Sequence, residues 1–275
     1  MKEKREISNQ EYHQADGISK SVMDAWNRSP WHYQQAISGQ REINATTQKT
    51  FDIGTAVHTA VLEPEKFENE IISGPDARGN SNEWKNFVAD HPAQIVLKPA
   101  DHRMVLDMAE SVFLHPKAHR LLQKGQAEAS YFWEDHATGR QCKCRPDYAR
   151  PDLHTLIDLK TCIDGAAHPA KFEKYILVYR YYLQAAFYLQ GASFVENHEY
   201  DTFAFICVEK APPYLVSVCT LSPDWIIVGK EEARITLRDI AKFEQSETPS
   251  MGYPEIVHEI PAPEWWVKTK LGELV

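Results

Sequence analysis

The chain has 275 residues, of which 43% are hydrophobic and 25% charged, as in globular proteins with one large domain or one domain and a small appendage. No apolar run reaches membrane-spanning length, the N-terminus has no signal-like apolar region, and five cysteines lack framework spacing, so we expect a cytoplasmic protein without membrane association. The net charge of −9 argues against a nonspecific DNA-coating protein, but not against an enzyme whose positive charge is concentrated in one channel.

The first half of the chain has the apolar periodicity of helices. A segment with Ile18, Val22 and Trp26 on one stripe follows a cap at Asp16 or Ser19. We expect helices at residues 15–37, 54–63 and 101–123, the second stopped by Pro64 and the third broken near His115–Pro116. The polar, glycine-containing segment 73–82 predicts a loop.

The second half changes to the alternating pattern of strands. We expect strands at residues 129–134, 139–147, 155–160, 201–209 and 214–221, and helices at 169–177, 179–192 and 223–245, the last capped by Ser222. This order predicts a mixed α/β core, with a central mixed β-sheet flanked by helices. We expect a single domain over residues 1–275, in which N-terminal helices (12–125) cover a core (126–246), followed by an irregular proline-rich tail (247–275).

Two carboxylates and a lysine have the most informative spacing in the chain. Asp147 ends one alternating run, and Asp158 and Lys160 lie two apart in the next, where strand geometry places them on one face. The turn-like segment 149–154 predicts that the runs 141–147 and 155–160 form an antiparallel hairpin, which brings Asp147 close to the other two. The alternative is a surface hairpin with an ordinary ion pair, although the apolar flanks of Asp158 favour a buried strand.

These residue types suit phosphodiester hydrolysis. Carboxylates bind Mg²⁺, which retains open positions for water and for phosphate oxygens. An ammonium beside the metal can orient or deprotonate the water and offset developing negative charge. The pattern Asp147, Asp158 and Lys160 resembles the active-site signature of PD-(D/E)xK nucleases.

Other polar residues have weaker signals. Gln184 and Tyr188 share a helix face with Tyr181, and the face either lines a nucleic-acid channel or packs in the core. His58, on an otherwise apolar helix, is by itself best interpreted as a core residue. Cys142 and Cys144 share a strand face and are interpreted as small packing residues, because zinc and iron–sulfur sites need more ligands.

Taken together, the motifs resemble those of one family. Gly54-Thr-Ala-Val-His58, the run Thr138–Asp147, Ile157-Asp-Leu-Lys-Thr161 and the pair Gln184 and Tyr188 follow in the order seen in RecE-like exonucleases. This is the exodeoxyribonuclease VIII group of phage and prophage recombination enzymes, within the PD-(D/E)xK superfamily. The segments Gly17–Ser21 and Ser29–Tyr33 also look like the N-terminus of that family.

The resemblance implies a restriction-endonuclease-like core in a bacterial or phage-encoded protein. It implies Mg²⁺-dependent, processive 5′→3′ degradation of one strand from double-stranded DNA ends, with Mn²⁺ as a substitute metal. It also implies a ring-shaped homo-oligomer, a trimer or tetramer, and a RecT-like single-strand annealing protein as partner. The implied metal ligands are His58, Asp147, Asp158 and the Leu159 carbonyl; Lys160, Gln184 and Tyr188 would complete the catalytic site.

An acidic chain that binds DNA requires segregated charge, so we expect a channel of basic residues created by oligomerisation. Candidates for DNA contacts are Arg28, Arg78, Lys85 and Tyr181. Two alternatives remain: a RecB- or Cas4-like nuclease module of a larger repair complex, and a non-catalytic DNA-end-binding protein. Cas4-like proteins need an iron–sulfur cysteine set, and the cysteines of this chain do not form a convincing one. The intact Asp147, Asp158 and Lys160 argue against a non-catalytic protein.

Overall fold

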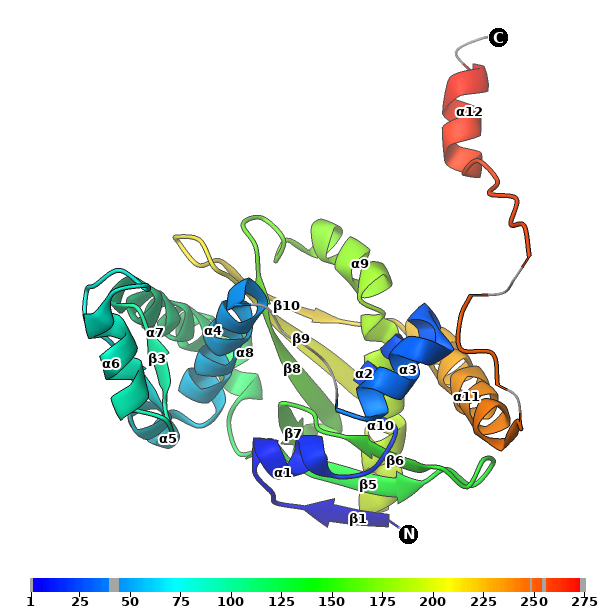
Figure 1. Cartoon of the computed structure of the whole chain (residues 1–275), viewed down its shortest axis with the longest axis horizontal. Helices are drawn as coiled ribbons and strands as arrows, with labels where there is room; N and C mark the ends of the chain where they lie inside the picture. Colours follow the sequence, from blue (N-terminus) through cyan, green and yellow to red (C-terminus); the bar gives the residue numbers. More distant parts are fainter. Residues whose placement is uncertain (1, 40–44, 248, 254–255, 273–275) are drawn as a thin grey trace.

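The computed structural model describes residues 2–39, 45–247, 249–253 and 256–272, and it has the expected mixed α/β architecture (Figure 1). A five-stranded sheet has the order β10-β9-β8-β7-β4. Its strands are β4 (Gln126–Ala127), β7 (Tyr148–Arg150), β8 (Thr155–Cys162), β9 (Thr202–Glu209) and β10 (Val216–Thr220). β8 and β9 pair in parallel and the other neighbours are antiparallel, so the sheet is mixed as predicted.

Helices flank this sheet. Those before the first sheet strand are α1 (Asn9–Gln14), α2 (Lys20–Arg28), α3 (Pro30–Ile37), α4 (Ala45–Leu62), α5 (Pro64–Glu70), α6 (Asn82–Asp90), α7 (Pro99–Leu114) and α8 (Pro116–Leu121). The later ones are the 3₁₀ turn η1 (Pro151–Leu153), α9 (Pro169–Val178), α10 (Tyr181–Glu196), α11 (Pro223–Gln245) and α12 (Glu264–Gly272). α9 and α10 form the crossover that a parallel β8–β9 pair requires.

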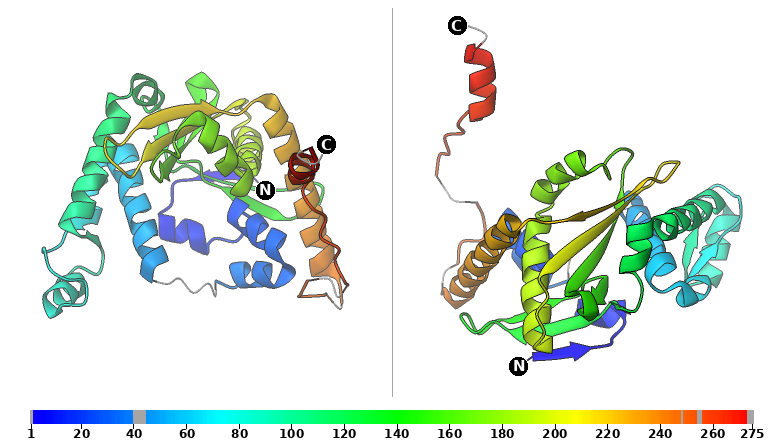
Figure 2. Two further views of the ribbon diagram at one scale, coloured as in Figure 1. Left: turned by 90° about the horizontal axis from the view of Figure 1, so that it is seen from above. Right: turned by 180° about the vertical axis from the view of Figure 1, so that it is seen from behind.

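The alternation of side chains along β8 divides the core into two clusters. Ile157 and Leu159 pack with α4 and α7 on one face, while Leu156 packs with α10 on the other. The views in Figure 2 show the sheet between these helical layers. Asp158 and Lys160 follow the parity of Leu156, so they point to the α10 side.

A second sheet, β1-β5-β6, supports the first. It comprises β1 (Lys2–Arg5), β5 (Ser130–Glu134) and β6 (Gln141–Cys144), all antiparallel. The buried ammonium of Lys143 donates hydrogen bonds to the carbonyls of Tyr12 and Ala15 (2.8 and 2.5 Å), which fix the N-terminal segment against β6. A short parallel pair, β2 (Ile71–Ser73) and β3 (Ile95–Leu97), lies among the first helices.

Several expected boundaries are wrong. The predicted helix 15–37 is two helices, because Pro30 cannot continue α2 but begins α3 after the cap Ser29. The helix expected at 54–63 begins earlier, at Ala45. The tail, expected to be irregular, contains α12, which stands away from the body (Figure 1); residues 248, 254–255 and 273–275 lie outside the described part.

The expected hairpin also needs correction. The run 141–147 does not pair with 155–160, because β6 ends at Cys144 and belongs to the other sheet. The strand that pairs with β8 is the shorter β7, with Tyr148 opposite Ile157. Asp147 therefore lies at the entrance to β7, and the sequence pattern misled because the chain changes sheets between Cys144 and Tyr148.

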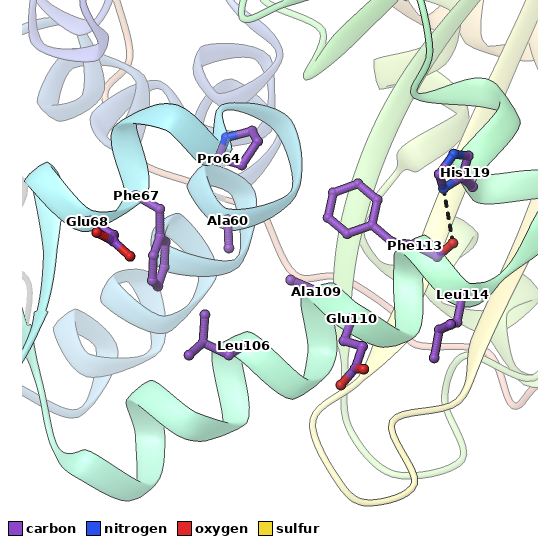
Figure 3. Close-up of a pocket in the computed structure, with 10 residues that line it drawn as sticks. All are labelled: Ala60, Pro64, Phe67, Glu68, Leu106, Ala109, Glu110, Phe113, Leu114 and His119. Atoms are coloured by element: carbon purple, nitrogen blue, oxygen red, sulfur yellow. Dashed lines mark hydrogen bonds between the residues drawn. The ribbon is translucent and has the colours of Figure 1, made fainter.

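An apolar cavity of about 510 Å³ lies between α4, α5 and α7 (Figure 3). Its lining includes Phe67, Leu106 and Phe113, and none of the candidate site residues predicted from the sequence. We therefore assign it no catalytic role. Among the described residues, no helix is long and apolar enough to cross a membrane.

Close packing of α10 against α11 depends on a glycine. A Cβ on Gly229 would lie 2.4 Å from the carbonyl oxygen of Tyr182, whereas one on Gly54 in α4 would meet nothing within 4 Å. We predict that Gly229→Ala lowers the free energy of unfolding by about 1–3 kcal/mol or more, since backbone must move. The control Gly54→Ala should raise it by about 0.5–1 kcal/mol through helix propensity. Urea denaturation measures both, and equal effects would contradict the packing.

Candidate active site

Strand register brings three carboxylates into one row. Ala127 of β4 is opposite Tyr148 of β7, and Tyr148 is opposite Ile157 of β8. Antiparallel pairing therefore places Glu128 beside Asp147, whose carbonyl accepts a 3.0 Å hydrogen bond from the Glu128 amide, and Asp147 beside Asp158. Neighbouring strands lie about 4.8 Å apart, so the row concentrates negative charge at one place in the sheet.

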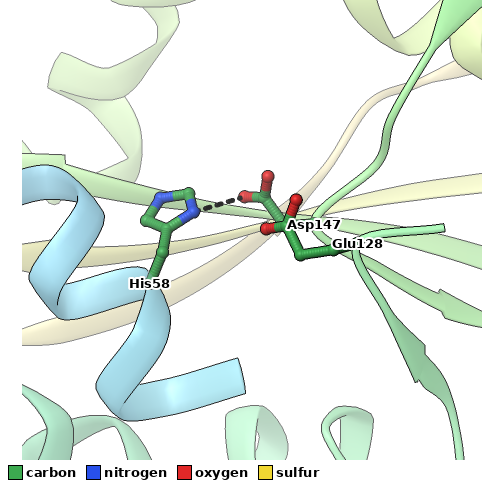
Figure 4. A group of neighbouring side chains, drawn as sticks. All are labelled: His58, Glu128 and Asp147. Atoms are coloured by element: carbon green, nitrogen blue, oxygen red, sulfur yellow. Dashed lines mark ion pairs between the residues drawn. The ribbon is translucent and has the colours of Figure 1, made fainter. Parts of the chain in front are cut away.

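His58 approaches the row from α4. Its Nε2 lies 2.9 Å from the Leu159 carbonyl oxygen, and its Nδ1 lies 3.6 Å from Asp147 Oδ2. Asp147 Oδ2 also accepts a 2.6 Å hydrogen bond from the Leu159 amide. Ligand atoms of His58, Glu128 and Asp147 all lie within 4.8 Å of one another (Figure 4).

This cluster fits a divalent metal ion. Two carboxylates, an imidazole and a backbone carbonyl are donors that Mg²⁺ or Mn²⁺ accepts. Metal–oxygen distances of about 2.0–2.1 Å place adjacent octahedral ligands about 2.9 Å apart, and the His58–Leu159 separation is of this size. The donor set and its spacing therefore suit a hard cation.

Asp158 faces a different pair of residues. Its Oδ1 accepts a hydrogen bond from Gln184 Nε2 at 2.5 Å, and its Oδ2 lies 2.6 Å from the Lys160 ammonium. Lys160 also donates to Gln184 Oε1 at 3.2 Å. Asp158 Oδ2 is buried and has no hydrogen bond of good geometry within the described residues, so it retains acceptor capacity toward a cation beside Asp147.

Burial and mutual repulsion perturb the carboxyl groups. Burial first, and then the neighbouring Asp158, raises the pKa of Asp147 to about 6. Burial, followed by Asp147, raises the pKa of Glu128 to about 7. These side chains are still 14% and 29% exposed, so solvent screens part of the repulsion. Both shifts arise because negative charge is gathered where little solvent neutralises it, an arrangement that a bound cation would stabilise.

For Lys160, burial and the neighbouring groups shift the pKa in opposite directions. Burial lowers its pKa, but Asp158, and then Tyr181 and Asp147, raise it, and the net shift is upward. The side chain is therefore an ammonium at neutral pH. It is suited to stabilising negative charge rather than to accepting a proton.

Two further side chains complete the surroundings. Tyr188 follows Gln184 by four residues on α10, so the two share a helix face, and burial raises the pKa of the Tyr188 hydroxyl. Arg145 is 3.8 Å from Glu128 and is held by Ser130 Oγ (2.8 Å) and the Ile7 carbonyl (2.8 Å). Its fixed positive charge partly compensates the row.

The structure brings together most of the site residues expected from sequence. His58, Asp147, Asp158, the Leu159 carbonyl, Lys160 and Gln184 form one contact network, and Tyr181 lies 4.4 Å from Lys160 across its ring face. The basic candidates lie elsewhere. Arg78 and Lys85 are exposed near and on α6, on the far side of α4 from the sheet (Figure 1), and exposed Arg28 contacts His32 at 2.9 Å.

Sequence reasoning missed Glu128. It follows the two-residue strand β4, and its φ of 53° is a left-handed conformation uncommon for glutamate. The available signal was a lone acidic residue just before the alternating run 129–134. That signal is weak, because only the β4–β7 pairing places Glu128 beside Asp147.

A mixed sheet carrying this carboxylate row beside a lysine defines the PD-(D/E)xK class of fold. In agreement, residues 19–254 match the model of a family described as the PDDEXK-like domain of unknown function (DUF3799). The chain belongs to this family. No curated protein matches its sequence.

Comparison with solved structures supports the same fold. A protein from Eubacterium rectale, provisionally named an exonuclease, superposes with a TM-score of 0.61 at 13% identity, over 96% of this chain and 98% of the other. At that identity the similarity shows the fold alone. A second structure, SSO0001, is 15% identical and covers 71% of this chain and 88% of its own, with a TM-score of 0.30, and carries no argument.

The raised carboxyl pKa values predict a pH-dependent stability. The folded, metal-free protein binds protons on Glu128 and Asp147 more tightly than the unfolded chain, so this contribution is full below about pH 4 and is lost as pH rises through 6 to 7. We predict that Tm in EDTA falls between pH 5 and 8, by about 2–4 °C per kcal/mol lost. Mn²⁺ should raise Tm more at pH 8 than at pH 5, because bound metal displaces these protons.

The matched variant is Glu128→Gln, which removes one titrating group and should flatten the pH dependence in EDTA. Differential scanning calorimetry over this range measures both effects. A Tm that rises toward pH 8 in EDTA, or an equally steep fall in the variant, would contradict the assignment.

Proposed function

We propose that this protein is a metal-dependent exodeoxyribonuclease that hydrolyses linear double-stranded DNA. The observation that carries the proposal is the row of Glu128, Asp147 and Asp158 with the Lys160 ammonium beside it. Paired carboxylates next to a fixed cation suit the hydrolysis of a phosphodiester, whose transition state gathers negative charge. Membership of the PDDEXK-like family supports the same chemistry.

Each residue of the site has a role that follows from its contacts. Glu128, Asp147, His58 and the Leu159 carbonyl would hold Mg²⁺ or Mn²⁺, with Asp158 contributing from the next strand. When bound, the ion would supply a water of lowered pKa and a Lewis acid for the phosphate. Lys160, protonated and held by Gln184, would place its positive charge toward the phosphate oxygens. Gln184 orients both Asp158 and Lys160, and Tyr188, four residues further along α10, would bound the site from the same helix face.

The resemblance to RecE-like exonucleases leads us to extend the proposal. We propose processive 5′→3′ degradation that leaves 3′ single-stranded overhangs, on which a RecT-like annealing protein would load. A ring of three or four copies would reconcile a net charge of −9 with a polyanionic substrate, since basic residues could then face an internal channel. Such a ring would also explain processivity, because the substrate could not diffuse away sideways.

The metal affinity of variants distinguishes residues that bind the metal from residues that only lie beside it. We predict that Asp147→Asn and His58→Ala each weaken Mn²⁺ binding by at least about tenfold, because each removes a ligand atom. Lys160→Ala should keep or strengthen binding, since it removes a nearby positive charge. Isothermal titration calorimetry measures this. If His58→Ala binds Mn²⁺ as the parent does, or Lys160→Ala loses binding, the ligand assignment is wrong.

Cleavage of end-labelled DNA tests the proposed function directly. Linear duplexes labelled separately at the 5′ or 3′ end, a nicked circle and a closed circle are incubated with Mg²⁺ or EDTA. We predict degradation of the linear duplex only, with early release of the 5′ label, and none in EDTA. Asp158→Ala and Lys160→Ala should each lower the rate by about 10²–10³-fold or more.

The control for these variants is Asp201→Asn, which changes an exposed aspartate before β9 and should retain parental activity. Activity of Asp158→Ala within tenfold of the parent would refute the site. Binding of DNA ends without cleavage would favour a non-catalytic end-binding protein, and early loss of the 3′ label would reverse the proposed polarity.

A further inference from the structure

A row of three tyrosines leads from Lys160 across the junction of α9 and α10. The Lys160 ammonium lies 4.4 Å from the centroid of the Tyr181 ring. The Tyr181 and Tyr179 rings are 5.5 Å apart with an interplanar angle of 27°, and Tyr179 and Tyr175 are 5.8 Å apart at 18°. The tyrosine row (Tyr181, Tyr179 and Tyr175) is therefore nearly parallel and begins at the candidate catalytic lysine.

The outer part of this row faces solvent. Tyr181 and Tyr175 are half-buried, and Tyr179 is 50% exposed. Parallel rings at these separations are offset and overlap only in part, and half of the Tyr179 side chain is open to solvent. A tyrosine that served packing alone would be covered by neighbours, as Tyr33 and Tyr131 are.

The junction that carries the row is fixed in place. Arg180, buried between Tyr179 and Tyr181 and with φ of 52°, contacts Glu232 of α11 at 2.6 Å and Asp24 of α2 at 3.2 Å. Lys20 donates a 2.6 Å hydrogen bond to the Tyr179 carbonyl. Two other helices, α2 and α11, thus hold the backbone that joins Tyr179 to Tyr181.

Cations accompany the rings. Lys20 lies 5.8 Å from the Tyr181 centroid, although Asp24 partly neutralises it at 2.6 Å. Lys171 is exposed and precedes Tyr175 by four residues on α9, which places it on the same helix face. The row thus has Lys160 at its inner end, with Lys20 beside the same Tyr181 ring.

We propose that the tyrosine row is a stacking platform for unpaired bases of the DNA strand next to the cleaved phosphate. Aromatic rings that hold successive bases, with lysines beside them for the phosphates, bind single-stranded nucleic acid without sequence preference. The inference rests on the proposed function, because its position beside Lys160 gives the platform its role. Because only unpaired bases can stack on the rings, the proposal requires that the DNA strand be separated from its complement before it reaches the site.

Binding of single-stranded DNA without cleavage tests the platform. The probe is a 5′-phosphorylated 12-mer of thymidine with one 2-aminopurine, and Ca²⁺ replaces Mg²⁺. We expect Tyr179→Ala to weaken binding by roughly 5- to 150-fold, the range for loss of one stacked base, and to remove the quenching of 2-aminopurine that stacking causes. Tyr179→Trp should restore both, because it restores an aromatic face.

The matched control is Tyr253→Ala, which removes a tyrosine that is 70% exposed but lies in the tail, and it should bind as the parent does. Tyr175→Leu provides a second test at the outer end of the row. If the parent fails to bind the probe, or if Tyr179→Ala binds and quenches like the parent, the platform is overturned even where linear duplex is degraded. Tyrosine-dependent binding by a parent that cleaves no DNA would instead support the platform and refute the nuclease proposal.

Discussion

The pairing of β7 with both β4 and β8 is the constraint on which the site depends. β7 has only three residues, yet its register places Glu128, Asp147 and Asp158 in one row across neighbouring strands. A shift of β7 by one residue would turn Asp147 to the other face of the sheet, away from Asp158 and Glu128. The same shift would exchange the places of Tyr148 and Ala149, which are buried in opposite core clusters, so the packing opposes it. The hydrophobic core therefore fixes the geometry of the charged groups.

Bringing three carboxylates together has an energetic cost, and the neighbouring positive groups offset this cost more fully for one carboxylate than for the other two. Asp158 is compensated within the chain by Lys160 and Gln184. Asp147 and Glu128 have weaker compensation from His58 and Arg145, so burial and then the neighbouring carboxylate raise their pKa values. The uncompensated part of the row lies beside His58, where the ligand atoms converge. A divalent cation there would relieve the repulsion, so the same arrangement that destabilises the metal-free protein would favour metal binding.

The two helical layers make different contributions. α4 brings an imidazole to the row from one face, and α10 brings Gln184, Tyr181 and Tyr188 from the other. These groups meet only because β8 is buried between the layers, with the backbone of Leu159 contacting His58 and Asp147. The acidic groups of the site and the tyrosine row that begins at Lys160 thus lie near one another in a chain whose net charge is −9. Local arrangement, rather than overall charge, would decide whether DNA can approach.

The sequence by itself determined the fold class, most helices and strands, and the pairing of Asp158 with Lys160, because these depend on periodicities of two and 3.6 residues along a local segment. It also indicated the break before Pro116 and the caps Ser19 and Ser222. Only the tertiary structure decided that β6 leaves the sheet before Asp147, that Glu128 joins the row, and that Arg78 and Lys85 lie far from it. Those features depend on which strands pair over long separations, and no local pattern encodes that choice. The same reason explains the tyrosine row, whose members are close in sequence but are aligned with Lys160 only by the packing of α9 and α10 against β8.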